Sequence, residues 1–290
     1  MSSAGTWVGR LTKVQSPPEQ PQSTQRGATG LVGRLGVVQR AAMRFLFVLL
    51  SSLAGASLVR ADRAAELAQI HTEAIGGMKR IEALKAMRAT GHVVVAGSQV
   101  RFNLLAARPA LVRLETERGG RTLVQGTDGM EPPWEFDTGT WPPQYRSMNA
   151  TVAKTFVADA EFDDPLVAAE SRGFTLDYAG EMVVEGRKLL RVLVTRKLAE
   201  TFSILLDDDT FFIVMRVEHR ESAGGRRLQV VTHYEDFRPV EGVLLPHSIT
   251  LAVDGRATQQ TKIARIEANP DLSEARFSRP KVTAPAVQAP

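Results

Sequence analysis

From Ala89 onward the side chains alternate between apolar and polar at every second residue, and no other feature constrains the fold as strongly. Val100, Phe102 and Leu104 alternate with Arg101 and Asn103. Glycine- and aspartate-containing turn sequences separate such runs, with no helix between consecutive ones. Strands joined by short turns pair in an antiparallel meander. Similar runs occupy residues 112–115, 190–195, 202–206 and 249–253.

Two stretches follow a helical period instead. In residues 62–87 apolar side chains recur at steps of three and four, and Gly76-Gly77 divides the stretch into two helices. Residues 147–171 return to this spacing, with Asp163-Asp164-Pro165 placed as a cap and first-turn proline. Residues 131–143 contain four prolines and cannot form a central strand. We therefore expect a mainly β fold with some helix, in which roughly ten strands form a strongly curved antiparallel sheet, an incomplete β-barrel, under a helical lid.

The N-terminal residues indicate export. Residues 43–61 begin with Met43-Arg44, continue with fifteen uncharged residues and end in Val59-Arg60-Ala61. Small or light residues at the −3 and −1 positions of the cleavage site are typical of a signal peptide. An uncleaved anchor is the alternative. Residues 1–42 predict a disordered or mis-assigned upstream extension, and 281–290 a loose tail around a single domain over 62–280.

The charge of the chain argues against a nucleic-acid partner. The whole chain has a formal net charge of +4. Seven of its Lys and Arg residues and one acid fall in residues 1–61, which leaves 29 basic and 31 acidic residues afterwards. The basic balance therefore belongs to the leader.

Motifs for catalysis and cofactors are missing from the sequence. The chain has no cysteine, so it offers no disulfide, thiolate nucleophile or lipid-bearing N-terminal cysteine. Its five histidines show no ligand spacing, and no GxSxG, phosphate-binding loop or dinucleotide-binding motif occurs. We predict that the protein is not an enzyme and holds no cofactor or metal.

Strand alternation then selects a candidate site. Two helices over one face of a curved sheet would enclose an apolar cavity, although a packed core without a cavity has the same periodicity. Arg101, Arg113 and Arg191 are expected to face outward or toward the rim. The expected apolar lining consists of Phe102, Leu104, Val112, Leu114, Val192, Val194, Phe202 and Ile204.

An ordered set of short motifs resembles the outer-membrane lipoprotein-sorting proteins of the LolA/LolB type. The set spans about residues 62–280, and its most extensive element is Tyr234-Glu235-Asp236-Phe237-Arg238-Pro239-Val240-Glu241-Gly242. The other motifs are Ala74-Ile75-Gly76-Gly77, Thr127-Asp128-Gly129, Phe162-Asp163-Asp164-Pro165-Leu166, Ile266-Glu267-Ala268-Asn269-Pro270 and Arg276-Phe277-Ser278.

The resemblance implies a monomeric carrier in the Gram-negative periplasm. Its cargo would be an acylated lipoprotein or lipid held in an apolar cavity, and an inner-membrane export complex is a further partner. The missing cysteine excludes the lipid-anchored branch. Arg101 and Arg113 are candidates for the family's lid-closing arginine. A domain of the same fold that senses lipid or envelope proteins, and transfers nothing, is the alternative.

Overall fold

The computed structural model describes residues 62–140, 144–196, 200–222, 225–272 and 277–279. The expected signal peptide, upstream extension and C-terminal tail lie outside these ranges. Among the described residues, no helix combines the length and the apolar character needed to cross a bilayer.

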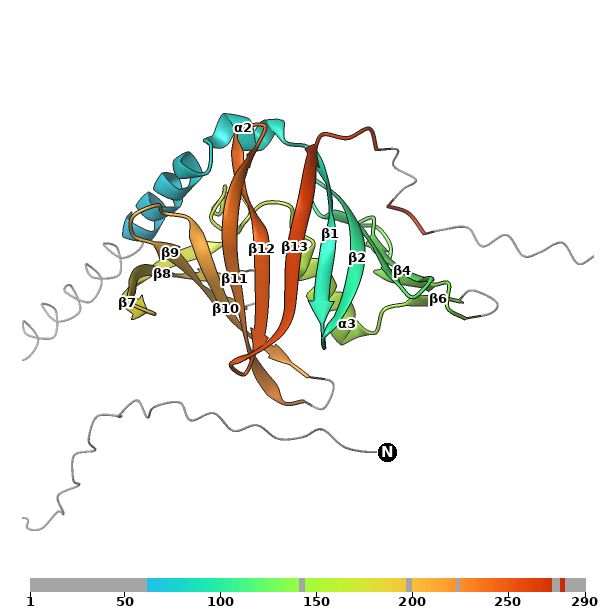
Figure 1. Cartoon of the computed structure of the whole chain (residues 1–290). Helices are drawn as coiled ribbons and strands as arrows, with labels where there is room; N and C mark the ends of the chain where they lie inside the picture. Colours follow the sequence, from blue (N-terminus) through green and yellow to red (C-terminus); the bar gives the residue numbers. More distant parts are fainter. Residues whose placement is uncertain (1–61, 141–143, 197–199, 223–224, 273–276, 280–290) are drawn as a thin grey trace, which may run out of the picture. The chain divides into compact units, whose positions relative to one another are not determined.

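A single antiparallel sheet forms most of the molecule (Figure 1). Its 13 strands follow the order β6-β5-β4-β3-β2-β1-β13-β12-β11-β10-β9-β8-β7, so only the β1–β13 pair joins distant parts of the chain. The strands are β1 (Ala86–Val95), β2 (Ser98–Ala107), β3 (Leu111–Arg118), β4 (Arg121–Thr127), β5 (Trp134–Asp137), β6 (Gln144–Ser147), β7 (Thr175–Val184), β8 (Arg187–Thr195), β9 (Thr201–Asp207), β10 (Ile213–Glu221), β11 (Arg227–Val240), β12 (Val243–Val253) and β13 (Arg256–Ala268).

The prediction of an incomplete β-barrel is wrong about the curvature of the sheet. The sheet is open: β6 and β7 are its two edge strands and do not pair with each other, and the sheet does not curl strongly. Sheets of more than about ten strands curl, split or flatten, and open ones of this size do occur. Here the faces receive separate covers from helices and from the C-terminal residues, so burial of the apolar side chains does not require closure.

The helices are shorter than the sequence predicted. One helix covers residues 62–74, α2 covers Met78–Ala83 and α3 covers Ala150–Asp159. Asn149 caps α3, because its side chain accepts a hydrogen bond from the backbone N–H of Val152. Residues 165–173 form consecutive turns rather than a continuation of α3. Asp164 caps these turns by accepting from the N–H groups of residues 166 and 167.

The largest core cluster lies under the helix of residues 62–74. Leu67 of this helix and Leu166 of the turn segment pack with fully buried Val192 and Val194 of β8 and with Ile204 of β9. The apolar runs of β8 and β9 are therefore covered by protein.

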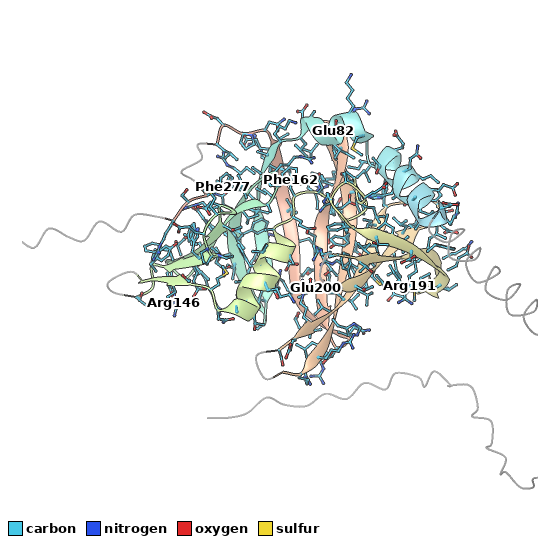
Figure 2. All side chains as sticks on the ribbon, turned by 180° about the vertical axis from the view of Figure 1, so that it is seen from behind. Glu82, Arg146, Phe162, Arg191, Glu200 and Phe277 are labelled. Carbon is cyan, nitrogen blue, oxygen red and sulfur yellow. The ribbon has the colours of Figure 1, made fainter. Side chains whose placement is uncertain are left out.

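The opposite face of the sheet has its own cover near β5. Trp134 is 2% exposed and its indole N–H donates to the carbonyl of Phe277. The neighbouring β4 residue is Gly126, where an added Cβ would lie 2.6 Å from the Trp134 ring. The proline-rich segment thus contributes a strand one place from the sheet edge. Figure 2 shows Phe277 and Arg191 toward opposite ends of the sheet.

Candidate functional site

An apolar groove of about 870 Å³ lies between α3 and the sheet. We call it the α3 groove. Its aliphatic side chains come from two pairs of strands that β1 and β13 separate in the sheet. The helix side includes Val152, Thr155 and Phe156. The sheet side contributes the polar residues Gln125, Arg220 and Glu221 and the apolar residues Leu104, Val112, Leu114, Leu228, Val230, Leu251 and Val253.

Helix α3 is attached to the sheet by few apolar contacts. None of its residues is buried, and Val152 and Val157 are each 44% exposed. Phe156 packs on a small cluster with Val112, while Asp159 forms an ion pair of 2.8 Å with Arg220 of β10. Exposed ion pairs contribute little to stability, about 0–1 kcal/mol. The apolar packing of α3 on the sheet is therefore limited to side chains such as Phe156.

A second cavity of about 330 Å³ lies next to the C-terminal end of α3. We call it the arginine cavity. Its apolar wall combines residues of the helical N-terminal segment and of the strands, and its polar wall holds Arg108, Arg196 and Arg216 together with four carboxylates. Asp159 lines both this cavity and the α3 groove. The apolar wall includes Ile75, Ile81, Ile204, Ile213, Val243 and Ile249.

His71 links three segments at the rim of the arginine cavity. Its ring is 2% exposed, with Nδ1 2.7 Å from the carbonyl oxygen of Phe211 and Nε2 3.2 Å from Asp164 Oδ2. Burial alone would lower the pKa of His71, but the charge and hydrogen bond of Asp164 and the carbonyl outweigh it, so the pKa is raised above 6.5. Burial likewise opposes ionisation of Asp164, yet His71 and two backbone N–H groups lower its pKa.

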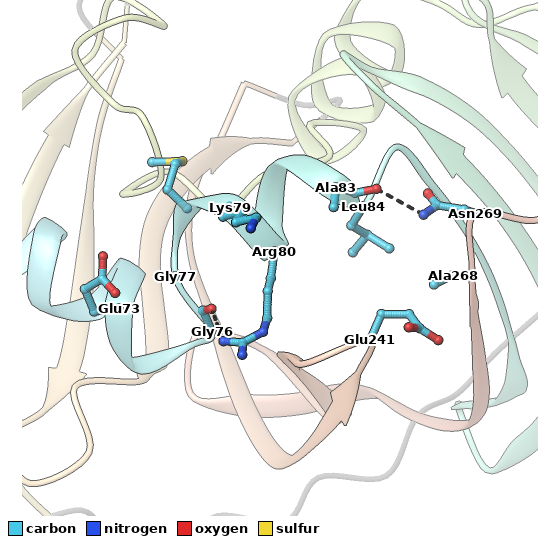
Figure 3. Close-up of a pocket in the computed structure, with 11 residues that line it drawn as sticks. Glu73, Gly76, Gly77, Lys79, Arg80, Ala83, Leu84, Glu241, Ala268 and Asn269 are labelled. Carbon is cyan, nitrogen blue, oxygen red and sulfur yellow. Dashed lines mark hydrogen bonds between the residues drawn. The ribbon is translucent and has the colours of Figure 1, made fainter.

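A third hollow, of about 700 Å³, lies beside α2 and the end of β13 (Figure 3). Its polar side chains form hydrogen bonds with backbone groups at the two ends of α2. Arg80 donates to the carbonyl of Gly76, and the Asn269 side-chain amide donates to the carbonyl of Ala83. Asn269 also accepts from the backbone N–H groups of residues 85 and 86. These contacts join α2 to the sheet, so we interpret the hollow as a structural joint.

Comparison with known proteins identifies the fold. No model of a known protein family matches the sequence, and no curated protein matches it. The structure resembles a domain assigned to the outer membrane lipoprotein-sorting proteins, from Vibrio parahaemolyticus, with a TM-score of 0.51 and 10% identity over 75% of this chain and 97% of that one. It resembles a DUF1329 family protein from Desulfovibrio piger with a TM-score of 0.53 and 10% identity over 76% and 97%. The chain shares the fold of these two proteins. A LolA superfamily protein from Nitrosomonas europaea aligns with a TM-score of 0.48 and 13% identity, over 74% and 98%.

Within this fold the expected lining residues do not gather in one cavity. Leu104, Val112 and Leu114 line the α3 groove, and Ile204 lines the arginine cavity. Val192, Val194 and Phe202 lie in the packed core with Ile204. Phe102 is buried beside Gly91 of β1. On β8 and β9, Arg191 is exposed and donates to Ser203.

Sequence reasoning missed half of the groove. Leu228, Val230, Leu251 and Val253 lie on β11 and β12, and the alternation of residues 249–253 was visible in the sequence. The alternation did not indicate which strands lie opposite α3. The arginines of the second cavity carried no sequence signal, because Arg196 and Arg216 are 20 residues apart and meet only through strand pairing. In the described part of the chain, no group of three or more His, Cys, Asp or Glu side chains could hold a metal ion.

Proposed function

We propose that the protein is a periplasmic carrier-like protein that binds acyl chains of lipoproteins or lipids in the α3 groove and catalyses no reaction. The observation that carries the proposal is the groove itself. It is lined by aliphatic side chains on the sheet and covered by a helix that buries none of its own residues. Such a site gains affinity by removing an alkyl chain from water, at about 0.8 kcal/mol per buried CH₂.

The chemistry of the lining supports binding without catalysis. The residues around the α3 groove include no serine, cysteine, histidine or lysine. Its hydroxyl groups belong to Thr151 and Thr155, and neither has a hydrogen bond to a carboxylate among the described residues, which disfavours an activated nucleophile there. Its polar residues lie on or just before α3, at the end of β10 and on β4, where they can meet water or a head group.

The fold shared with the lipoprotein-sorting domain supports the envelope as the location and an acylated lipoprotein as the cargo. Folds of one kind host several functions, so the cargo assignment depends on the groove and requires a direct test. An inner-membrane export complex is the expected partner in loading, with the protein acting as a monomer.

Binding of a fluorescent diacylglyceryl lipopeptide to the full-length protein tests the proposal. Leu251→Asn should weaken binding roughly ten- to a hundredfold, because it removes apolar contact and places an amide without partners against the alkyl chain, at about 1–3 kcal/mol. The matched control is Thr250→Asn, on the adjacent residue of β12 whose side chain faces the other side of the sheet. We expect this control to bind like the wild type.

Circular dichroism and thermal unfolding of each variant establish that it is folded before its affinity is compared. A folded wild-type protein that does not bind the lipopeptide would remove the carrier proposal. Equal affinities for Leu251→Asn and Thr250→Asn would remove the α3 groove as the site.

A further inference from the structure

Two largely buried arginines that line the arginine cavity share one aromatic ring, which belongs to the adjacent core. The guanidinium carbon of Arg196 lies 5.0 Å from the ring centroid of Phe202, and that of Arg216 lies 4.5 Å from the same centroid. The two side chains are only 11% and 12% exposed. Two guanidinium charges largely out of water are stable only when acceptors surround them.

The available acceptors satisfy these guanidinium groups only in part. Arg196 donates through Nη2 to Glu161 at 3.1 Å and to the carbonyl of Ala158 at 3.4 Å. Arg216 donates through Nη2 to Glu218 at 2.6 Å. The Nε atoms of both arginines are buried and have no hydrogen-bond partner among the described residues. A guanidinium carries five N–H donors in a planar fork suited to carboxylate and phosphate oxygens.

The surrounding carboxylates are shared among several cations. Glu161 also accepts from Arg172, and Glu218 also accepts from Arg220. Asp163 pairs with Arg108. Each carboxylate therefore has less acceptor capacity to give to the arginine pair.

His71 adds a positive charge to the same network. Both of its ring nitrogens face oxygen acceptors, a carbonyl and a carboxylate, and only the imidazolium donates from both nitrogens. The ion pairs at and around the cavity then involve six cations and five carboxylates, while the groups that line the cavity itself are balanced, with four cations and four carboxylates. The cations are Arg108, Arg172, Arg196, Arg216, Arg220 and His71, and the carboxylates are Asp159, Glu161, Asp163, Asp164 and Glu218.

We infer that the arginine cavity binds the head group of a single-chain anionic amphiphile, with a carboxylate or phosphate monoanion on Arg196 and Arg216. The alkyl chain lies against the apolar wall formed by residues such as Ile204 and Ile213. The site deepens the proposed function and rests on it for the binding of alkyl chains, since the two cavities meet at Asp159. The head-group oxygens would accept from the Nε atoms of Arg196 and Arg216, which have no hydrogen-bond partner among the described residues.

Ligands that share a tail and differ in the head group test this inference. Dodecanoate, dodecyl phosphate and 1-dodecanol are titrated calorimetrically into the full-length protein at pH 6.5, below their micelle concentrations. At least one anion should bind roughly ten- to a hundredfold more tightly than the alcohol, as expected for hydrogen bonds to charged groups. The anion that binds more tightly shows whether the site prefers a carboxylate or a phosphate head group. Preference for either anion over the alcohol supports the site. A wild-type protein that binds dodecanol as tightly as both anions overturns the inference, whatever the variants do.

Variants then locate the head group. Arg216→Gln and Arg196→Gln should each reduce the preference for the anion by a similar factor and leave dodecanol binding unchanged. Arg191→Gln is the matched control, because Arg191 is exposed and outside the arginine cavity. A preference for anions that persists in folded Arg196→Gln and Arg216→Gln also overturns the site.

The two proposals fail separately. Anion binding that depends on Arg216 but is insensitive to Leu251→Asn, together with no binding of the lipopeptide, supports the arginine cavity and removes the α3 groove. Lipopeptide binding sensitive to Leu251→Asn with no preference for anions removes the arginine cavity alone. Failure of all alkyl ligands to bind removes both.

Discussion

At the scale of single residues, His71 holds together segments that are distant in the sequence. Its ring connects the helix of residues 62–74 to Asp164 of the turn segment and to the carbonyl of Phe211 after β9. Asp164 is bound in turn by the N–H of Leu166, and Arg172 donates to its backbone carbonyl. The ion pair between protonated His71 and the Asp164 carboxylate therefore stabilises the rim of the arginine cavity.

This pair predicts a defined pH dependence of stability. The pKa of His71 is raised above 6.5, so its contribution is complete below about pH 6.5 and disappears as pH rises through the folded-state pKa. The pKa of Asp164 is lowered below 3.8, so its contribution holds above about pH 4 and disappears as pH falls through its folded-state pKa. His71→Asn should cost about 2 kcal/mol in unfolding free energy at pH 5–6 and less at pH 9.

Urea denaturation of both proteins across this range measures the difference. His219→Asn, at an exposed position on β10, is the control and should give a small difference at every pH. A cost for His71→Asn that is the same at pH 5.5 and pH 9 would show that the ring is neutral in the folded protein.

At the scale of elements, Gly76 and Gly242 allow the backbone between the two N-terminal helices to lie close against the β11–β12 turn of the sheet. Gly76 has a φ of 134°, and an added Cβ would lie 2.3 Å from the carbonyl oxygen of Gly242 in the β11–β12 turn. The carbonyl of Ile75 accepts from the N–H of Leu244 at 2.8 Å, and this hydrogen bond holds the two backbone segments close together. Only glycine meets both the backbone angle and the space.

We expect Gly76→Ala to destabilise the protein by about 2–4 kcal/mol, because it combines a strained backbone angle with a steric clash. Gly97→Ala is the matched control. Gly97 has a φ of 75° in the β1–β2 turn, with no heavy atom within 4 Å of an added Cβ, so only the backbone strain of about 1 kcal/mol applies. Thermal unfolding of the two variants gives the comparison, and equal losses would show that the approach to Gly242 is not tight.

Local patterns predicted these elements better than their arrangement. The Gly76-Gly77 break between two helices and the strand around Phe102 follow from glycine conformation and from the period of two, and both are observed. The helical spacing of residues 147–171 produced α3 only to Asp159, because Asp164 and Pro165 begin a run of turns. The position of Leu251 opposite α3 depends on pairing between β1 and β13, which lie at opposite ends of the domain sequence.

At the scale of the whole molecule, the openness of the sheet also lay beyond the sequence. Alternation reports which side chains share a face, and it does not report how far a sheet of 13 strands bends. The buried pair of Trp134 and Phe277 covers one face, while Leu67 covers the other. The alternation of apolar and polar side chains along the strands indicates neither of these contacts.

Hydrogen exchange of the native protein tests whether the edges are open. In β12 both sets of alternate amides donate to neighbouring strands, so its central amides should open only with a free energy near that of global unfolding. In β7 one set donates to β8 and the other points away from the sheet, so about half of the Thr175–Val184 amides should exchange with little protection. The four-residue strand β6 should show the same division. A β7 strand whose amides are all protected as strongly as those of β12 would mean that its outer edge is paired, as in a closed barrel.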